Sequence, residues 1–463
     1  TRRSTPCYHE GGTVMRLRVH ATMAFVVMIF ATQGCKGGEP STPPDAEVTS
    51  GGELPMQDDS VEKGGQSPAI ASTDAATSPW GATRAEQCSR PERTPMSSKA
   101  NRAFKRGLDA AQANDIASAQ QHFQDTLKKD ARAYPALYNL GVLADRSGDE
   151  RKALDYYQRS LGVLPDYEPA ARGITTIEIR RGDVQDAVAS VEPIARDHRT
   201  NLEIQALYAE VLVEARRYDE AWMAARRALK CDERFVPALI ALIKASRAQG
   251  RDELEDSILD QAMAIDANVA ELHFLNGERL KDEPGRLRDA LEAYLRAVQL
   301  RPDYAEARMA LGIQLLAGGN YADALSHFQV AEKLVPTLPA VHVNLGDAYR
   351  ASQRWTDAQQ AYRRAIELET KLPEAHFGLG LLYLSAGGDF PGLDEVSALE
   401  KSVGEFKIYR SQMGPRLGRD DQSEEYLRDL DRMIQRAKRR IERDKERSAR
   451  ETERGAREEA GAE

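Results

Sequence analysis

The sequence predicts an all-α protein: a superhelical solenoid of about nine helix–turn–helix repeats with a C-terminal capping helix, preceded by a signal peptide and a disordered linker. Two observations predict the solenoid. From about residue 100 the same residue types return every 34 residues, and a fixed period of this size indicates a repeat array. The composition agrees, because 41% apolar but only 6% aromatic residues suit many thin helix interfaces better than one large core.

The charge and cysteine content exclude two classes of protein. The 463 residues include 64 Lys and Arg against 73 Asp and Glu, a formal net charge of −9. An acidic chain lacks the basic face that neutralises phosphates, so we expect no nucleic-acid partner. Four Cys in this length exclude a scaffold built on disulfides.

The only strongly apolar run covers residues 21–32. As a helix it would span about 18 Å, which is shorter than a membrane crossing requires. Arg16 and Arg18 precede the run, and Gly34 and Cys35 follow it. A basic start, an apolar run and a small residue are typical of a secretory signal peptide. The Gly-Cys pair resembles a bacterial lipoprotein signal, which implies that Cys35 is lipidated; an ordinary signal peptide with a chance cysteine is the alternative.

The segment that follows is rich in Pro, Ser, Thr, Gly and Asp, and it cannot bury enough apolar surface to fold. We therefore expect residues 1–14 to precede a start at Met15, residues 15–34 to form the signal peptide and residues 35–97 to form a disordered tether. Such a tether reaches about 45 Å. Because Cys88 lies in the tether and Cys231 lies far away in the helical region, we predict no disulfide.

The 34-residue frame resembles the tetratricopeptide repeat (TPR). Aligning 134–167 with 305–338 matches Leu140-Gly141 with Leu311-Gly312, Ala153 with Ala324 and Tyr157 with Phe328. This is the family's pattern of a small residue at position 8, Ala at 20, an aromatic at 24, a small residue at 27 and Pro at 32. The resemblance covers residues 98–410, and the frame divides them into 100–133, 134–167, 168–201, 202–235, 236–269, 270–304, 305–338, 339–372 and 373–409.

Each repeat should contain two antiparallel helices, helix A at about positions 1–14 and helix B at about 18–31. Small side chains at positions 8, 20 and 27 let the two backbones approach, and the aromatic at 24 fills the space between repeats. Glycine at position 15 supplies the positive φ that ends helix A, as expected for Gly148, Gly182, Gly250 and Gly319. Proline ends helix B because it cannot donate the next helical hydrogen bond, as expected for Pro165, Pro302 and Pro336.

Some repeats depart from the frame, and we expect weaker places, bends or partner-contact loops there. The third repeat has Thr175, Val191 and Pro193, and the fifth has Ile243 and Glu255. The sixth carries one extra residue between its helices, and the ninth carries an insertion at 386–395.

Residues 411–463 follow the repeats as a capping helix and a charged tail. An apolar stripe at helical spacing should cover the open end of the stack; it comprises Tyr426, Leu430, Met433, Ile434, Ala437 and Ile441. Beyond Ile441 the charges alternate in sign, which is typical of a solvated helix or a disordered tail.

No motif for catalysis or nucleotide binding is present, so we expect a protein that is not an enzyme and needs no cofactor. His273, His342 and His376 share position 4 of three repeats. No carboxylate or Cys completes a ligand set around them, so we expect no metal site.

The resemblance implies that positions 2, 5, 6, 9, 12 and 13 of each helix A line a concave groove, apolar near both ends and charged in the middle. The alternative is that some of these residues pack between neighbouring helices A. The expected protein-binding residues are Phe104, Tyr138, Ile240, Phe274, Met309 and Phe377.

We therefore expect a non-catalytic scaffold that binds other envelope proteins, as a peptide or helix in its groove, and a membrane through its acyl anchor. Long TPR lipoproteins resemble components of envelope machines such as the gliding-motility apparatus. The alternatives are a regulator of periplasmic cell-wall hydrolases and an assembly factor for type IV pili or outer-membrane proteins. We expect a periplasm-facing lipoprotein of the bacterial envelope, with the outer membrane favoured and the inner membrane left open.

Overall fold

The computed structural model describes Cys88, residues 95–418 and residues 421–460, with side chains up to residue 454. The predicted signal peptide, Cys35 and most of the predicted tether lie outside these residues. The described chain divides between Leu272 and His273 into two compact bodies, which we call the N-terminal body and the C-terminal body. Each body is described by itself.

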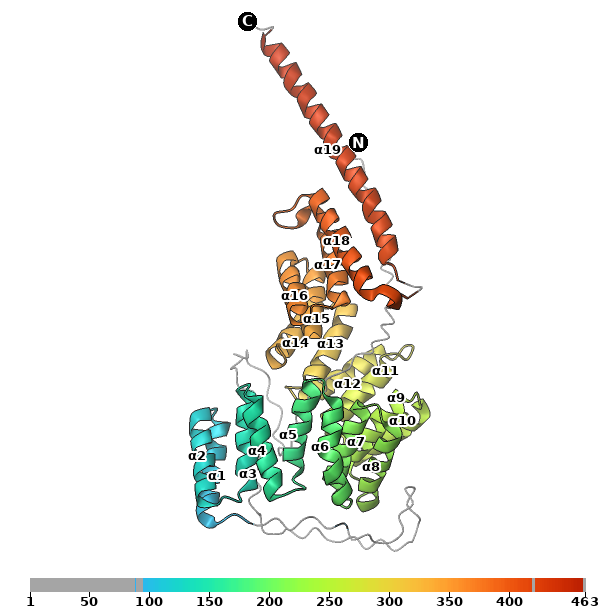
Figure 1. Ribbon diagram of the computed structural model, residues 1–463. Coiled ribbons are helices and arrows are strands. Elements are labelled where there is room, and N and C mark those ends of the chain that lie inside the picture. The colour runs from blue at the N-terminus through green and yellow to red at the C-terminus, as the bar shows by residue number, and fades with distance from the viewer. Residues whose placement is uncertain (1–87, 89–94, 419–420, 461–463) are drawn as a thin grey trace, which may run out of the picture. The chain divides into compact units, whose positions relative to one another are not determined.

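The regular structure of the described residues is helical throughout (Figure 1). The N-terminal body contains α1 (Ser98–Gln112), α2 (Ile116–Lys129), α3 (Tyr134–Arg146), α4 (Glu150–Val163), α5 (Glu168–Arg180), α6 (Val184–Asp197), α7 (Leu202–Glu214), α8 (Tyr218–Cys231), α9 (Val236–Ala248) and α10 (Asp252–Ile265). Helix α11 (Ala270–Leu280) begins in this body and ends in the next.

The C-terminal body continues the same alternation of helices. It contains α12 (Leu287–Leu300), α13 (Ala305–Ala317), α14 (Tyr321–Leu334), α15 (Pro339–Ala351), α16 (Trp355–Leu368), α17 (Pro373–Ala386), α18 (Glu395–Met413) and α19 (Ser423–Ala460), with short 3₁₀ turns at Gly387–Asp389 and Gly414–Arg416. Odd-numbered helices up to α17 are helices A of the frame, and even-numbered helices are helices B. The predicted all-α solenoid of helical hairpins is confirmed.

Glycine at position 8 lets an aromatic ring of helix B lie against the backbone of helix A. A Cβ atom on Gly312 would lie 2.6 Å from the ring of Phe328, and one on Gly141 would lie 2.5 Å from Tyr157. The ring of Tyr157 also reaches the next repeat, where a Cβ on Gly173 would lie 2.6 Å away. The aromatic at position 24 is therefore held between two helices A, as predicted.

The repeats that depart from the frame keep complementary volumes at the same two positions. Thr175 pairs with Val191 in the third repeat, and Ile243 pairs with Leu259 in the fifth; all four side chains are buried. A larger residue at position 8 thus accompanies a smaller one at position 24. These repeats are packed differently rather than left open.

The turns between helices A and B use a positive φ at position 15, as expected. Gly148, Gly182, Gly250 and Gly319 have φ between 66° and 85°. The same position in three other repeats holds a residue with a side chain, at Asn114, Arg216 and Gln353, whose φ values are 57°, 58° and 56°. The turn geometry therefore persists where the glycine is missing.

The prediction of no disulfide is wrong. Cys88 and Cys231 form a disulfide across 143 residues of sequence, with their Cα atoms 5.5 Å apart. Cys231 lies at the C-terminal end of α8, within the N-terminal body that also contains Cys88. The prediction relied on separation along the sequence, which does not set the distance between two residues in the folded chain.

Helix α19 packs against α18 at the end of the array, where the capping helix was predicted. Leu430, Ile434 and Ala437 are buried, and Tyr426 stacks on Phe406 of α18 with ring centroids 5.3 Å apart. The remainder of α19 extends away from α18 (Figure 1). None of the described helices is both long enough and apolar enough to span a bilayer.

Candidate protein-binding site

Helices A form the inner side of each body. Consecutive helices A contact one another, as α5 does with α7, α7 with α9, α13 with α15 and α15 with α17, in addition to their contacts with helices B. Stacked hairpins approach most closely on the concave side of a solenoid. The surface formed by helices A, called here the inner face, is therefore the candidate binding site.

The three predicted groove residues of the N-terminal body differ in exposure. Phe104 has no exposed surface and lies 5.6 Å from the ring of Phe123, so it is part of the core between α1 and α2. Ile240 on α9 is also buried. Tyr138 on α3 is half-buried, and its ring lies between those of Tyr157 and Tyr167.

The three predicted groove residues of the C-terminal body also belong mainly to the packing. Met309 on α13 is buried. Phe274 is half-buried and contacts the ring of Tyr304 at 5.3 Å. Phe377 is half-buried and contacts the rings of Phe406 and Tyr409 on α18 and Tyr426 on α19. Three of the six predicted groove residues are thus buried, and the other three are half-buried against aromatic rings that lie mostly in the same repeat.

Charged side chains connect successive helices A on the inner face of the N-terminal body. Arg172 on α5 donates to Glu168 on the same helix at 2.5 Å and to Glu210 on α7 at 2.8 Å. Lys244 on α9 pairs with Glu271 on α11 at 2.5 Å. These side chains are only 14–16% exposed. We call Glu168, Arg172, Glu210, Glu214, Lys244 and Glu271 the charge ladder.

The environment of the charge ladder keeps its cations charged. Burial lowers the pKa of Lys244, but Glu271 and Glu210 raise it by more, so that the net shift is upward. Burial likewise lowers the pKa of Arg172, and Glu168 and Glu210 raise it above its ordinary value. Both groups therefore remain cationic despite their burial.

The side chain of Glu214 differs from the other carboxyl groups of the ladder, because it forms no ion pair or hydrogen bond with another described residue. Burial raises its pKa to about 7, opposed by Lys244 and reinforced by Glu210 and Glu271. The ladder contains four carboxyl groups and two cations. The carboxyl groups therefore outnumber the cations by two, and Glu214 accounts for one of these two.

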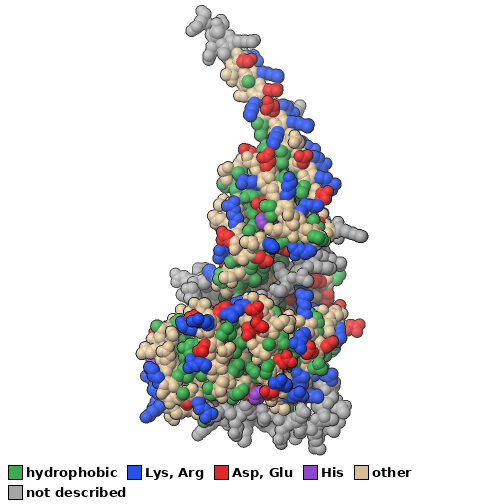
Figure 2. Space-filling view, in the orientation of Figure 1, with side chains coloured by type: hydrophobic (Ala, Val, Ile, Leu, Met, Phe, Trp, Pro, Cys, Tyr) green, Lys and Arg blue, Asp and Glu red, His purple; other side chains and the backbone are tan. Residues whose placement is uncertain are grey.

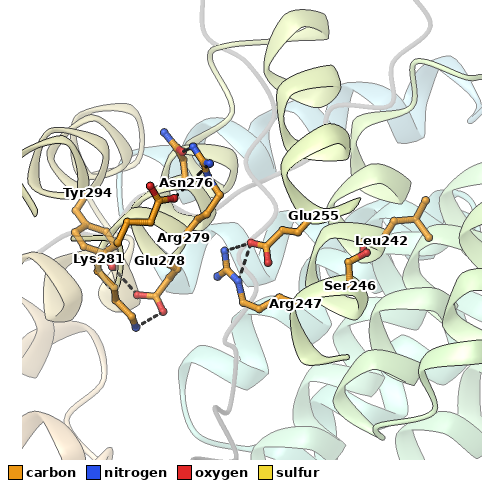
Figure 3. Close-up of polar contacts among 10 residues, drawn as sticks. Leu242, Ser246, Arg247, Glu255, Asn276, Glu278, Arg279, Lys281 and Tyr294 are labelled. Carbon is orange, nitrogen blue, oxygen red and sulfur yellow. Dashed lines mark hydrogen bonds and ion pairs between the residues drawn. The ribbon is translucent and has the colours of Figure 1, made fainter. Parts of the chain in front are cut away.

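Other carboxylates form hydrogen bonds with neighbouring side chains and serve the packing of the helices (Figure 3). In the N-terminal body, the buried Glu255 accepts from Arg247 at 2.9 Å, which explains how position 20 tolerates a carboxylate. In the C-terminal body, Glu278 accepts from Tyr294 at 2.7 Å and from Lys281 at 2.6 Å. Both carboxylates hold neighbouring helices together.

In the C-terminal body, the residue type at position 9 correlates with the presence of a hydroxyl group on the aromatic residue at position 24. Tyr294 and Tyr362 each donate to a carboxylate at position 9, Glu278 and Asp347 respectively, both at 2.7 Å. Phe328 has no hydroxyl, and position 9 of its repeat is Ile313. That side chain is 42% exposed on α13, so it presents an apolar contact on the inner face.

Two parts of this site were not assigned from the sequence. The groove was expected to be charged in its middle, but the ion pairs of Arg172 and Lys244 join helices through residues 27 to 38 apart and depend on how helices A stack. Ile313 occupies position 9 of its repeat, and the repeat frame alone does not indicate that its side chain is exposed. The match between Tyr and a carboxylate at positions 24 and 9 is the sequence signal that separates Ile313 from its neighbours.

The described residues hold no group of three or more His, Cys, Asp or Glu placed to bind a metal ion. His376 pairs with Glu405 at 2.7 Å, and His342 lies 2.8 Å from the carbonyl oxygen of Pro336. His376 thus contacts its own repeat, and His342 contacts the preceding one.

Comparison with known proteins agrees with the repeat frame. A family described as tetratricopeptide repeat matches residues 104–169 and 281–339, and one described as TPR repeat matches residues 346–387. A photosystem I assembly protein, Ycf3 of Rippkaea orientalis, is 30% identical over 121 residues, which cover 25% of this chain and 64% of that protein. The human protein O-mannosyl-transferase TMTC1 is 27% identical over 190 residues, 40% of this chain and 21% of its own length.

The chain therefore spans less than two thirds of the length of either relative. Among solved structures, PilW, described as a widely conserved type IV pilus biogenesis factor, is 14% identical, with a TM-score of 0.40, and covers 50% of this chain and 97% of that one. The matched segments fall on the helix pairs and repeat positions described above. The chain thus contains tetratricopeptide repeats, matched over residues 104–169, 281–339 and 346–387.

Proposed function

We propose that the protein is a non-catalytic scaffold that binds partner proteins on its inner face. The proposal rests on two side chains of the inner face, one exposed and apolar and one acidic without an ion partner, that do not hold helices together. Ile313 is 42% exposed on α13 although most apolar residues of helices A are buried. Glu214 on α7 lacks an ion partner within the described residues. Such a face can bind an extended peptide or a helix.

The inner face of the N-terminal body favours a partner segment that carries Lys or Arg. Four carboxyl groups of the charge ladder share two cations. A partner cation next to Glu214 would supply the missing positive charge and would hold that carboxyl in its ionised form. Charge complementarity of this kind selects partners and their orientation.

Ile313 allows a direct test with a matched control. Leu295 on α12 is 44% exposed, nearly the same as Ile313, but it lies on a helix B. Ile313→Asp should weaken the capture of partners from the native envelope by about tenfold, since one buried aliphatic contact contributes about 1.5–3 kcal/mol. Leu295→Asp should leave capture unchanged. Equal capture by both variants and the wild-type chain would remove the inner face of α13 from the proposal.

The partners recovered in the same experiment separate the proposed roles. Subunits of a motility apparatus would support a scaffold within an envelope machine, including the gliding-motility type. Recovery of a cell-wall hydrolase would instead support a regulator of that enzyme. Pilus or outer-membrane assembly proteins would support an assembly factor.

We also propose that the scaffold is tethered to the bacterial envelope through an acylated Cys35. The basic, apolar and Gly-Cys order of residues 16–35 supports this proposal. The disulfide between Cys88 and Cys231 supports an oxidising compartment, because disulfides persist in the periplasm and are rare in the cytosol. Cys35→Ala should move the protein from the membrane fraction to the soluble fraction of lysed cells, and an unchanged distribution would contradict the anchor.

A further inference from the structure

Helix α19 continues far beyond the part that packs on α18. Its 38 residues, Ser423–Ala460, correspond to a length of about 57 Å. Ala437 is the last buried residue, and every described side chain from Lys438 to Arg454 is exposed. More than a third of the helix therefore has no packing role in the C-terminal body.

Arginines along α19 recur at spacings of three and four residues. At 100° per residue they fall within an arc of about 100°, on the side of the helix away from the buried Leu430, Ile434 and Ala437. The two lysines of this helix, Lys438 and Lys445, fall outside that arc. We call this set the arginine stripe; it comprises Arg428, Arg432, Arg436, Arg439, Arg443, Arg447, Arg450 and Arg454.

The guanidinium groups of the stripe are accessible. Arg432, Arg447 and Arg450 form ion pairs within the helix, all between exposed side chains. Such surface pairs contribute little and exchange readily with other partners. Further members of the stripe form no ion pair with any described residue; these are Arg428, Arg436, Arg439 and Arg443.

Basic side chains outnumber acidic ones along the exposed part of α19, whereas a helix stabilised only by its own ion pairs would carry equal numbers of both. Over the full span of the stripe, residues 428–454 contain eleven basic and seven acidic side chains, and the excess is concentrated in residues 436–447, with seven basic and three acidic side chains; the whole chain has a net charge of −9. Figure 2 shows Lys and Arg side chains, in blue, along α19. The exposed side carries no large apolar residue to insert into a bilayer, so contact with a membrane would be electrostatic and confined to its surface.

We propose that the arginine stripe binds a membrane surface that carries anionic phospholipid headgroups. Guanidinium groups pair with phosphate oxygens through two parallel hydrogen bonds, and basic side chains near an anionic leaflet are attracted to it. From Arg428 to Arg454 the stripe is straight and about 39 Å long. A flat headgroup surface meets such a row along its whole length, whereas the curved backbone of a duplex nucleic acid meets only part of it.

Vesicle sedimentation tests the proposal on the full chain, with Cys35→Ser included so that no acyl group contributes. The protein should co-sediment with phosphatidylcholine vesicles that contain phosphatidylglycerol and not with pure phosphatidylcholine vesicles. Binding should weaken as salt is raised, because exposed charges are screened. Equal binding to both kinds of vesicle, or binding to neither, would overturn the proposal.

Two variants that each remove two positive charges distinguish a specific role of the arginine stripe from an effect of net charge. Arg439→Gln with Arg443→Gln should weaken binding to the anionic vesicles by about tenfold or more. Lys438→Gln with Lys445→Gln should change it by less than about twofold, with circular dichroism showing unchanged helicity in both. Equal loss in the two variants would contradict a role for the stripe. Preferential binding to duplex DNA or to an acidic protein at the same salt would assign the stripe to that partner instead.

Discussion

Glycine at position 8 and the aromatic at position 24 act as one packing element at the residue scale. Six repeats place a glycine where an added Cβ would lie under 3.0 Å from a ring of helix B; the glycines are Gly107, Gly141, Gly277, Gly312, Gly346 and Gly380. Contacts this short require the ring or the helix to move. Close packing therefore couples the two positions.

Replacing Gly312 tests this coupling. Gly312→Ala should lower the free energy of unfolding by about 1–3 kcal/mol, because its Cβ would lie 2.6 Å from the fully buried ring of Phe328. Phe328→Leu should destabilise the protein on its own by leaving a cavity. The double variant should be more stable than the sum of the two changes, as measured by urea unfolding.

Gly404 provides the matched control, since it lies inside α18 with no atom within 4 Å of an added Cβ. Gly404→Ala should stabilise the protein by up to about 1 kcal/mol, because alanine is the better helix former. Destabilisation by Gly404→Ala, or full additivity between Gly312→Ala and Phe328→Leu, would contradict the packing described for position 8.

The sequence predicted local structure correctly where a single residue type is enough to set it. Position 15 required a positive φ, and glycine identified it in four repeats. Arg216 and Gln353 adopt the same φ without that signal. Thr175 with Val191 and Ile243 with Leu259 keep their packing through a compensation between two residues, which a rule for each position alone does not reveal.

At the scale of the helices, the inner face of the N-terminal body is organised by ion pairs between successive helices A. Arg172 joins α5 to α7, and Lys244 joins α9 to α11. The partners of each pair are too far apart in sequence for helical spacing to predict them. At position 5, Phe104 and Ile240 are buried in the packing, whereas Tyr138 remains half-buried.

Glu214 should make the stability of the protein depend on pH. Its pKa is about 7 in the folded protein, against 4.5 for an unperturbed glutamate. The folded protein thus retains a proton that the unfolded chain has lost between these values, and the free energy of unfolding falls as pH rises from about 4.5 to about 7. The contribution lost is about 3 kcal/mol.

Glu214→Gln should abolish this contribution, because the amide does not ionise. The measurement is urea unfolding of the wild-type chain and the variant at pH 5 and pH 7, with the exposed Glu233→Gln as the control. The difference in stability between the wild-type chain and Glu214→Gln should change by about 2–3 kcal/mol between these pH values. A constant difference would show that Glu214 ionises normally.

At the scale of the whole molecule, the disulfide closes 143 residues of chain into a covalent loop. The loop contains the first three repeats and most of the fourth, from α1 to the end of α8. Cross-linking a long loop stabilises a fold chiefly by restricting the unfolded chain. A repeat array otherwise depends on contacts between neighbours alone.

Removal of the disulfide should therefore destabilise the N-terminal body. Cys231→Ser should lower its free energy of unfolding by about 2–4 kcal/mol, and reductant should have the same effect on the wild-type chain but none on the variant. Peptide mapping without reduction should recover the peptide of Cys88 joined to that of Cys231. Two free thiols in the purified protein would contradict the bond.

The central claim is that helices A present the surface to which partners bind. A photo-crosslinking residue placed at 313 on α13, or at the similarly exposed 295 on α12, measures this directly in intact cells. Position 313 should give a discrete cross-linked partner, and position 295 should give none. Cross-links that form at 295 and not at 313 would place the binding surface on helices B and contradict the account.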